Sequence, residues 1–236
     1  MTLDPFGSIA LSPTTADRQQ VTRRFALAGL GAAAIGLGLP RRVWAQTPQD
    51  MVFRVHRGSS PMGWLRTGFS RDGDRLTVRT KLELSVYIAF VRAFRYEHTS
   101  EEVFQGNRIL SITADTNDDG KQYKVRATPV GTNVRVEGPL ETVTAPAATL
   151  TTNSVWNPAF VRQQMLIDCE KGRYVPLRVQ PLGDKSVTVA KVARVATGYR
   201  TTLPYADADL YYDGAGAWVH AVYRTKGETL VYERES

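Results

Sequence analysis

The chain has 236 residues, 42% of them hydrophobic and 22% charged, with a formal net charge of +7. A chain of this length can bury a sizeable core, and its single cysteine excludes an internal disulfide. The basic residues are spread along the sequence instead of forming a patch, which argues against a nucleic-acid partner. The sequence contains neither a glycine-rich dinucleotide motif nor a hydrolase nucleophile elbow, so it predicts no cofactor.

The first element in chain order is a predicted twin-arginine export signal. Arg23 and Arg24 stand directly before an apolar run at residues 25–39, which is shorter than the roughly 20 residues that cross a bilayer core. Small residues then precede a signal-peptidase site, and we predict cleavage after Ala45. A general secretory signal and an uncleaved anchor are the alternatives that the sequence leaves open.

Cleavage divides the chain into a leader with its signal peptide, residues 1–45, and a single mature β domain, residues 46–236. The leader carries five basic and two acidic side chains, so its removal lowers the net charge from +7 to +4. Position 46 is Gln, whereas lipid attachment requires Cys. We therefore expect a soluble periplasmic protein that meets the twin-arginine translocase during export and has no stable membrane anchor.

Residues 75–86 show the clearest β-strand pattern. Apolar and polar residues alternate here, and the apolar set is Leu76, Val78, Leu82, Leu84 and Val86. Successive side chains of a strand point to opposite faces, so this strand has one dry face and one wet face. Such one-sided burial is typical of antiparallel sheets, whereas the strands of buried parallel sheets are apolar throughout.

A polar cluster follows this strand. In an extended segment Arg95 and Glu97 share one face, whereas Phe94, Tyr96 and His98 share the other. A histidine beside aromatic side chains is a candidate general base if polar partners converge on it. His98, Arg95 and Glu97 are therefore the weak candidate catalytic residues, and the alternative is a histidine whose polar tip lies at the rim of a sheet.

Residues 115–120 open like a calcium-binding loop, D-x-N-x-D-G. Position 126 is Arg, where that loop needs a bidentate Glu, so a hairpin turn is the favoured interpretation. The three histidines, His56, His98 and His220, lack the spacing of zinc ligands. The sequence therefore predicts no metal site.

Two segments interrupt the strand pattern in the second half of the chain. Residues 157–166 are predicted to form a short helix, with Asn157 as N-cap and Pro158 at the first helical position. Residues 146–150 have the composition of a turn or a second short helix. Acidic residues flank Cys169 and would raise the pKa of its thiol, so we expect no catalytic role for it.

Turn signals separate the apolar runs along the mature chain. Each contains Gly, Asn or Asp, which tolerate the positive φ that hairpins require. They lie at residues 72–74, 105–107, 118–120, 131–133, 182–185, 213–216 and 226–227. Roughly ten short strands joined in this way predict an all-β domain, built as a single antiparallel meander with one or two short helices.

Several segments together resemble a known family. They are residues 68–74, 94–98, 116–121, 123 and 156–158. In this order they are similar to an uncharacterised family of proteobacterial exported proteins, catalogued as a domain of unknown function, and the likeness covers nearly all of residues 51–235. Such proteins resemble in fold the periplasmic lipoprotein carriers LolA and LolB and the violacein enzyme VioE, which implies a curved, half-open antiparallel β-barrel. The family has no assigned activity, so the resemblance implies no catalytic residues.

Large aromatic side chains supply the remaining candidates. A curved sheet with one apolar face makes a concave surface that suits an acyl chain or another apolar molecule. The candidate ligand-lining residues are Phe90, Phe94, Tyr96, Trp156, Tyr212 and Trp218. The alternative is that these side chains fill the core, with the 157–166 segment as a plug.

Three functions are consistent with the sequence. The first is a binding or carrier protein of the cell envelope, with an apolar small molecule as its partner. The second is a cofactor-free enzyme on an apolar substrate, which needs His98, Arg95 or Glu97 to point into the cavity. The third is an interaction module that pairs through an exposed sheet edge. The lack of catalytic motifs favours the first.

Overall fold

The computed structural model of the protein describes residues 47–88, 91–225 and 227–235. The predicted signal, with Arg23, Arg24 and the cleavage position after Ala45, lies outside the described residues. The same is true of Phe90, one of the candidate ligand-lining residues. No helix in the described part of the chain is long and apolar enough to cross a membrane.

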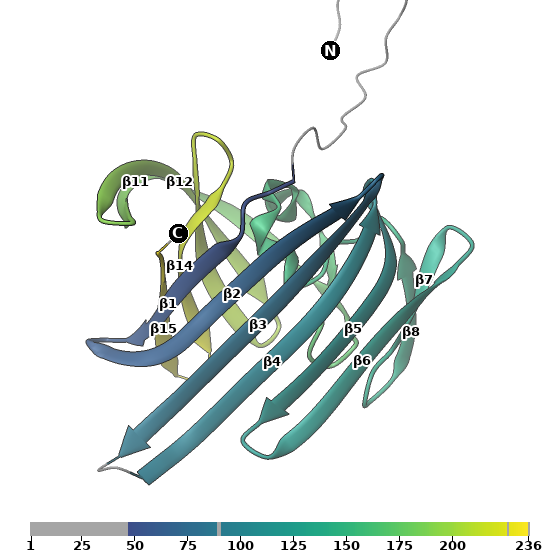
Figure 1. The fold of residues 1–236 in the computed structure, drawn as a ribbon, viewed down its shortest axis with the longest axis horizontal. Helices are drawn as coiled ribbons and strands as arrows, with labels where there is room; N and C mark the ends of the chain where they lie inside the picture. Colours follow the sequence, from purple (N-terminus) through teal and green to yellow (C-terminus); the bar gives the residue numbers. More distant parts are fainter. Residues whose placement is uncertain (1–46, 89–90, 226, 236) are drawn as a thin grey trace, which may run out of the picture. The chain divides into compact units, whose positions relative to one another are not determined.

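Thirteen strands of the described chain form one antiparallel sheet. In chain order they are β1 (Met51–Arg57), β2 (Ser60–Asp72), β3 (Arg75–Ile88), β4 (Val91–Gln105), β5 (Arg108–Asp118), β6 (Lys121–Val130), β7 (Asn133–Glu137), β8 (Thr142–Pro146), β11 (Arg178–Val189), β12 (Val192–Leu203), β13 (Ala206–Asp213), β14 (Trp218–Thr225) and β15 (Glu228–Arg234). Sequential strands are neighbours, except that β8 and β11 are the two edges and β15 pairs with β1. Figure 1 shows this sheet twisting and curving between its two edges. The expected all-β, half-open antiparallel fold is confirmed.

One face of the sheet, which we call the inner face, carries the main hydrophobic core. Met51, Phe53 and Val55 of β1 are buried on it, while the residues between them are partly exposed. Leu76 and Val78 of β3 are buried in the same core. Period-two alternation therefore sends apolar side chains to one face of these strands, as the sequence predicts.

Most of the predicted turns are confirmed. Asp119 and Gly120 have φ values of 51° and 94°, so this two-residue connection lets β5 return directly as β6. The predicted turns found between strands are 72–74, 105–107, 118–120, 131–133 and 213–216, and residue 227 of the last one also lies in a turn. The number of strands was underestimated, because the described chain has fifteen, and β2, β3 and β4 reach 13, 14 and 15 residues.

The predicted turn at residues 182–185 is wrong. β11 runs unbroken through this segment, and its pairing with β12 shifts register between Pro181 and Gly183. Gly183 has a φ of 79° and supplies a bulge in place of a chain reversal. The reversal lies at Ala190 and Lys191, whose φ values are 48° and 68°, although neither residue type favours this conformation.

The connection from β8 to β11 is residues 147–177, which we call the crossover. It contains two 3₁₀ turns, η1 (Ser154–Trp156) and η2 (Pro158–Arg162), and a small two-stranded sheet of β9 (Met165–Ile167) and β10 (Tyr174–Pro176). The ring of Trp156 packs edge-on against Phe69 of β2, with ring centroids 5.1 Å apart, and against Phe104 of β4 at 6.2 Å. From the other half of the sheet, Tyr212 of β13 donates its hydroxyl to the carbonyl of Val155 at 2.8 Å. The crossover therefore covers the inner face and touches both halves of the sheet.

The predicted helix over residues 157–166 is wrong in type and length. Its start is as expected, because the Asn157 side chain accepts a hydrogen bond from the backbone N–H of Ala159 at 2.9 Å. The chain then forms a 3₁₀ turn and becomes extended at Gln163, where ψ is 151°. Phe160 is the buried residue of η2, and a single apolar anchor gives no stripe along which a longer helix could pack.

A second, smaller core lies on the outer face of the sheet. Leu210 and Tyr212 belong to the main core, so Tyr211 between them points outward. The members of this outer core are Val187, Val189, Ala196, Tyr211 and Val219. The hairpin of β11 and β12 supplies three of them, and the backbone N–H of Ala190 donates to the carbonyl of Arg234 at 3.3 Å. One-sided burial, expected from the sequence, therefore does not hold at this end of the sheet.

Candidate functional site

Polar side chains meet between β4 and the crossover. His98, Ser100 and Glu102 alternate along β4 and are all buried on the inner face. The crossover supplies four facing residues, which are Thr151, Asn153, Ser154 and Cys169. These seven residues make up what we call the β4–crossover network.

Glu102 lies at the centre of this network, with 0% of its surface exposed. Its Oε2 accepts a hydrogen bond from the Thr151 hydroxyl at 2.8 Å. The Thr151 oxygen lies 3.0 Å from Ser154 Oγ and accepts from the backbone N–H of Asn153 at 3.2 Å. Burial raises the pKa of Glu102 to about 7, although the hydrogen bonds, that of Thr151 first, act to lower it.

Asn153 connects the crossover to His98. Its Nδ2 donates to Ser100 Oγ and to His98 Nε2, both at 2.9 Å. The imidazole proton is then on Nδ1, which lies 2.7 Å from the hydroxyl of Thr116 on β5. Burial lowers the pKa of His98, although nearby carboxylates, that of Glu170 first, act to raise it. His98 is therefore a neutral, fully hydrogen-bonded group at neutral pH.

Cys169 is the remaining reactive group in the network. Its Sγ lies 3.9 Å from Glu102 Oε1, and its side chain is buried. Burial, and then the Glu102 carboxyl, raise the pKa of this thiol well above its usual value. Because the thiolate is the nucleophilic form, this environment suppresses nucleophilic chemistry at Cys169.

The network continues toward the surface at the end of the crossover. The Tyr96 hydroxyl donates to Glu170 Oε2 at 3.0 Å. Lys171 Nζ binds the other oxygen of Glu170 at 2.8 Å and lies over the ring of Tyr123. Burial, followed by the charge of Glu170, raises the pKa of Tyr96, so this phenol acts as a hydrogen-bond donor.

Asp168 links the same turn to the rim of the sheet. Its carboxylate accepts from the backbone N–H of Glu170 at 2.9 Å and from Arg173 Nη2 at 3.0 Å. The Arg173 guanidinium stacks on the ring of Tyr205, 5.1 Å from its centroid. Tyr205 lies between β12 and β13, so the crossover and this hairpin are in direct contact.

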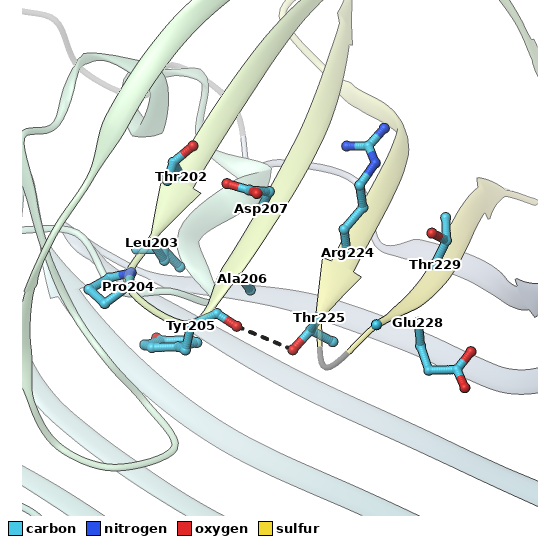
Figure 2. A pocket seen from close by; sticks show the side chains of 11 residues that line it. Thr202, Leu203, Pro204, Tyr205, Ala206, Asp207, Arg224, Thr225, Glu228 and Thr229 are labelled. Atoms are coloured by element: carbon cyan, nitrogen blue, oxygen red, sulfur yellow. Dashed lines mark hydrogen bonds between the residues drawn. The ribbon is translucent and has the colours of Figure 1, made fainter.

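A pocket of about 530 Å³ opens at the rim where β12 turns into β13 and β14 into β15 (Figure 2). Leu203, Pro204 and Ala206 form its apolar part, and Asp207 and Arg224 stand on the neighbouring strands. We call it the rim pocket. It is an open cleft with both apolar and charged walls, not an enclosed cavity.

The two hairpins that form the rim pocket are joined across it. Thr225 donates its hydroxyl to the carbonyl of Tyr205 at 3.3 Å, as Figure 2 shows. Burial, and then the charge of Asp168, raise the pKa of the Tyr205 phenol, which keeps it neutral.

The three candidate catalytic residues do not converge. The Arg95 guanidinium pairs with the Glu97 carboxylate, and both side chains are partly exposed. His98 lies on the opposite face, buried beneath the crossover. Strand alternation separates Arg95 and Glu97 from His98, which alone of the three faces inward, and a catalytic role for His98 stays a prediction.

Five of the six candidate ligand-lining residues can be placed. Trp156, Tyr212 and Trp218 are buried in the main core, where Trp218 packs against Phe53 with ring centroids 4.1 Å apart. Tyr96 is partly buried against the same core, and the partly exposed Phe94 pairs with Val86 of β3. These side chains fill the space between sheet and crossover, and contact with a ligand remains a prediction for them.

The segment at residues 115–120 is the end of β5 followed by a hairpin turn at residues 119–120, in line with the favoured interpretation. Asn117 Oδ1 accepts from the backbone N–H of Gly120 at 2.8 Å, and Asp115 pairs with Arg126 at 3.1 Å. Each of the three histidines has its own surroundings: His56 lies 3.7 Å from Glu233, and His220 packs beside Tyr211. Within the described residues, no group of three or more His, Cys, Asp or Glu is placed to hold a metal ion.

Sequence reasoning missed most of the β4–crossover network. A signal existed in the adjacent pair Glu101 and Glu102, because alternation must turn one of two consecutive strand residues inward. The partners Thr151 and Asn153 carry no comparable signal, since nothing in their local pattern relates them to β4.

Comparison with known proteins agrees with this fold. Residues 53–235 match the sequence model of a family described as "Domain of unknown function (DUF6134)". No functionally curated protein matches the chain. Among solved structures, the chain is similar to a beta-barrel-like protein of the domain of unknown function DUF1849 from Brucella abortus, with a TM-score of 0.58. That match covers 80% of this chain and 95% of the other at 10% identity, so it shows the fold alone.

Proposed function

The chain belongs to the DUF6134 family, whose function is unknown, and we propose that it is an exported periplasmic protein that binds an apolar or lipid-like molecule at the rim of its curved sheet. The observation that carries this proposal is the rim pocket, where an apolar wall continuous with the core meets charged and hydroxyl side chains. Export is supported by the pair Arg23 and Arg24 before an apolar run.

The apolar wall of the rim pocket extends the main core. Leu203 lines the pocket and is also partly buried against the core. Tyr199 of the same strand, Tyr223 of β14 and Leu230 of β15 are likewise partly buried against this core. An apolar group bound against Leu203 would therefore bury surface on both partners. Such burial contributes about 25 cal/mol per Å² of apolar area.

The polar wall is held in place by ion pairs. Arg224 Nη2 binds Asp209 at 2.7 Å, and Glu228 Oε1 binds Arg57 at 3.3 Å. Fixed charges of both signs suit the polar end of an amphipathic molecule. The volume of the pocket is within the roughly 300–1,000 Å³ of small-molecule sites.

Binding of the apolar fluorescent probe N-phenyl-1-naphthylamine tests the site. We expect Leu203→Asp to weaken probe binding about tenfold, because a charge on the apolar wall opposes burial. The matched control is Leu140→Asp, at a residue that is 72% exposed outside the pocket, and its affinity should equal that of the natural protein. Equal affinity of both variants would remove the rim pocket as the site.

Export is tested separately by fractionating cells. Arg23→Lys with Arg24→Lys should leave the protein in the cytoplasm, whereas Arg41→Lys with Arg42→Lys should not. Arrival in the periplasm of the variant with Arg23 and Arg24 replaced would contradict the proposed export signal.

Native mass spectrometry of the periplasmic protein should show a co-purifying lipid-like mass. The absence of such a mass would contradict the proposed ligand.

A further inference from the structure

The Glu102 carboxyl is buried among neutral groups. Its Oε2 contacts the Thr151 hydroxyl at 2.8 Å and its Oε1 the Cys169 thiol at 3.9 Å. The neutral side chains of Asn153 and Ser100 also hydrogen-bond to this carboxyl. Among the described residues, no ion pair includes Glu102. A buried carboxylate without a cation is strongly disfavoured relative to the neutral acid.

The contacts with Thr151 and Cys169 come from the crossover. Thr151 is 49 residues and Cys169 is 67 residues further along the chain than Glu102. One stands before the 3₁₀ turns and the other after β9. The carboxyl therefore joins two separate points of the crossover to the C-terminal part of β4.

The strands beside β4 bring no charge to this carboxyl. Val78 of β3 and Ile112 of β5 are the register partners of Glu102, and both are buried and apolar. The register partners of Glu102 on the neighbouring strands therefore carry no charge that would favour either its neutral or its ionised form.

The titratable groups that face Glu102 lie on β4 and on the crossover. His98 is on the same face of β4 and is bound to Asn153. Cys169 faces the carboxyl directly and stays a thiol. Asp168, next to it, is paired with Arg173. None of these groups supplies a cation to the carboxyl.

We infer that Glu102 is a proton-operated latch, which holds the crossover against the inner face while its carboxyl is neutral and loosens it when the carboxyl ionises. The carboxyl is fully buried under the crossover, and the hydration gained when the crossover lifts from β4 would favour the ionised form. An effect of the latch on the rim pocket, which the crossover touches where Arg173 stacks on Tyr205, rests on the proposed function, whereas the latch itself does not.

The direction of the pH dependence follows from the Glu102 environment. Burial raises its pKa from 4.5 to about 7 in the closed state. A raised pKa means that the closed state binds the proton more tightly than the open state does. The contribution of Glu102 to the stability of the closed state is therefore complete below pH 4.5 and is lost as the pH rises to 7. These two pKa values predict that the equilibrium constant for closing the crossover falls about 30-fold between pH 5.5 and 8.0.

His98 would give the opposite direction. Burial lowers the pKa of His98 in the closed state, so at low pH the open state takes up a proton on His98 more readily than the closed state does. A latch operated by His98 would therefore loosen the crossover at low pH, and the two residues are distinguished by sign.

Hydrogen–deuterium exchange of the crossover peptides in the mature protein tests the latch, with rates corrected for intrinsic exchange. We expect protection to fall about 30-fold from pH 5.5 to 8.0 in the natural protein. In Glu102→Gln, which keeps the shape without the charge, protection should change less than about threefold. The matched control Glu101→Gln, at the exposed neighbouring position, should behave as the natural protein does.

Equal pH dependence in Glu102→Gln, or unchanged protection in the natural protein, would overturn the latch. If Glu102→Gln does not fold, Thr151→Val decides the matter. Loss of this donor should move the midpoint of loosening to higher pH, because the Thr151 hydrogen bond lowers the Glu102 pKa, and an unmoved or lower midpoint contradicts the inference. No ligand enters this experiment, so its failure is distinct from a failure of probe binding at the rim pocket.

Discussion

Two carboxyl groups of the sheet are withdrawn from water, and they are held in opposite ways. Glu102 lies on the inner face against hydroxyls and a thiol. Asp209, 4% exposed, lies on the outer face between Arg200 and Arg224, at 2.8 and 2.7 Å. Burial acts to raise both pKa values, but the two guanidinium groups lower that of Asp209 to about 2, whereas that of Glu102 rises to about 7.

The difference comes from strand register. Arg200 of β12 is the direct register partner of Asp209 on β13, and Arg224 reaches the same carboxylate from β14. The corresponding partners of Glu102 are apolar. A buried acid is therefore a fixed charge where pairing supplies cations and a proton-binding group where it does not.

The largest expected effect is the loss of pH dependence in Glu102→Gln. A shift from 4.5 to about 7 makes Glu102 stabilise the natural protein below pH 4.5, and about 3 kcal/mol of this is lost by pH 8. Urea unfolding at pH 4.5 and 8 should show this loss in the natural protein and not in the variant. Parallel pH profiles of the two proteins would refute the assignment of this pH dependence to Glu102.

Asn153→Ala should have the next largest effect. It leaves His98 Nε2 and Ser100 Oγ without their partner, at about 2 kcal/mol of unfolding free energy. Added salt should not change this loss, because the contacts are between neutral groups. Strong salt dependence in urea unfolding would show that the inner network is ionic after all.

Asp209→Asn should cost about 1 kcal/mol at pH 7, a value reduced by the partial exposure of both arginines. The pKa is lowered, so this stabilisation is present above pH 3.8 and is lost as the pH falls through about 2. Unfolding in 0.05 M and 1 M salt should show a smaller effect at high salt. The opposite salt response, or none, would argue against the ion-paired description of Asp209.

The smallest effect is expected at Glu101, next to Glu102 in sequence. Glu101 binds Arg79 at 2.8 Å on the exposed face, and such surface pairs contribute about 0–1 kcal/mol. Glu101→Gln should therefore lower the unfolding free energy by about 0.5 kcal/mol or less. A larger loss would mean that the difference in burial between Glu101 and Glu102 does not decide how much each contributes to stability.

The sequence predicted the fold well where the rules are local. Alternation at residues 75–86 and Gly-containing turns such as 118–120 depend on neighbours within a few residues, and both were found. The turn at Ala190 and Lys191 was missed because its positive φ values come from the pairing of β11 with β12 and not from residue type.

The candidate site was predicted less well because its partners are far apart in the chain. The sequence indicates His98 as a candidate, but Arg95 and Glu97, beside it in sequence, face the other way. Glu102 is defined by residues 49 and 67 positions away, which no local pattern relates to β4. The crossover path that brings them together is a property of the whole sheet.

The most direct test of the account is the titration of Glu102 itself. Carbon-13 NMR of the side-chain carboxyl carbon, assigned with Glu102→Gln, gives the pKa without any assumption about unfolding. We predict a midpoint near 7 for Glu102. A midpoint near the ordinary 4.5 would show that water or a cation reaches this carboxyl in the closed state, and would contradict the neutral latch.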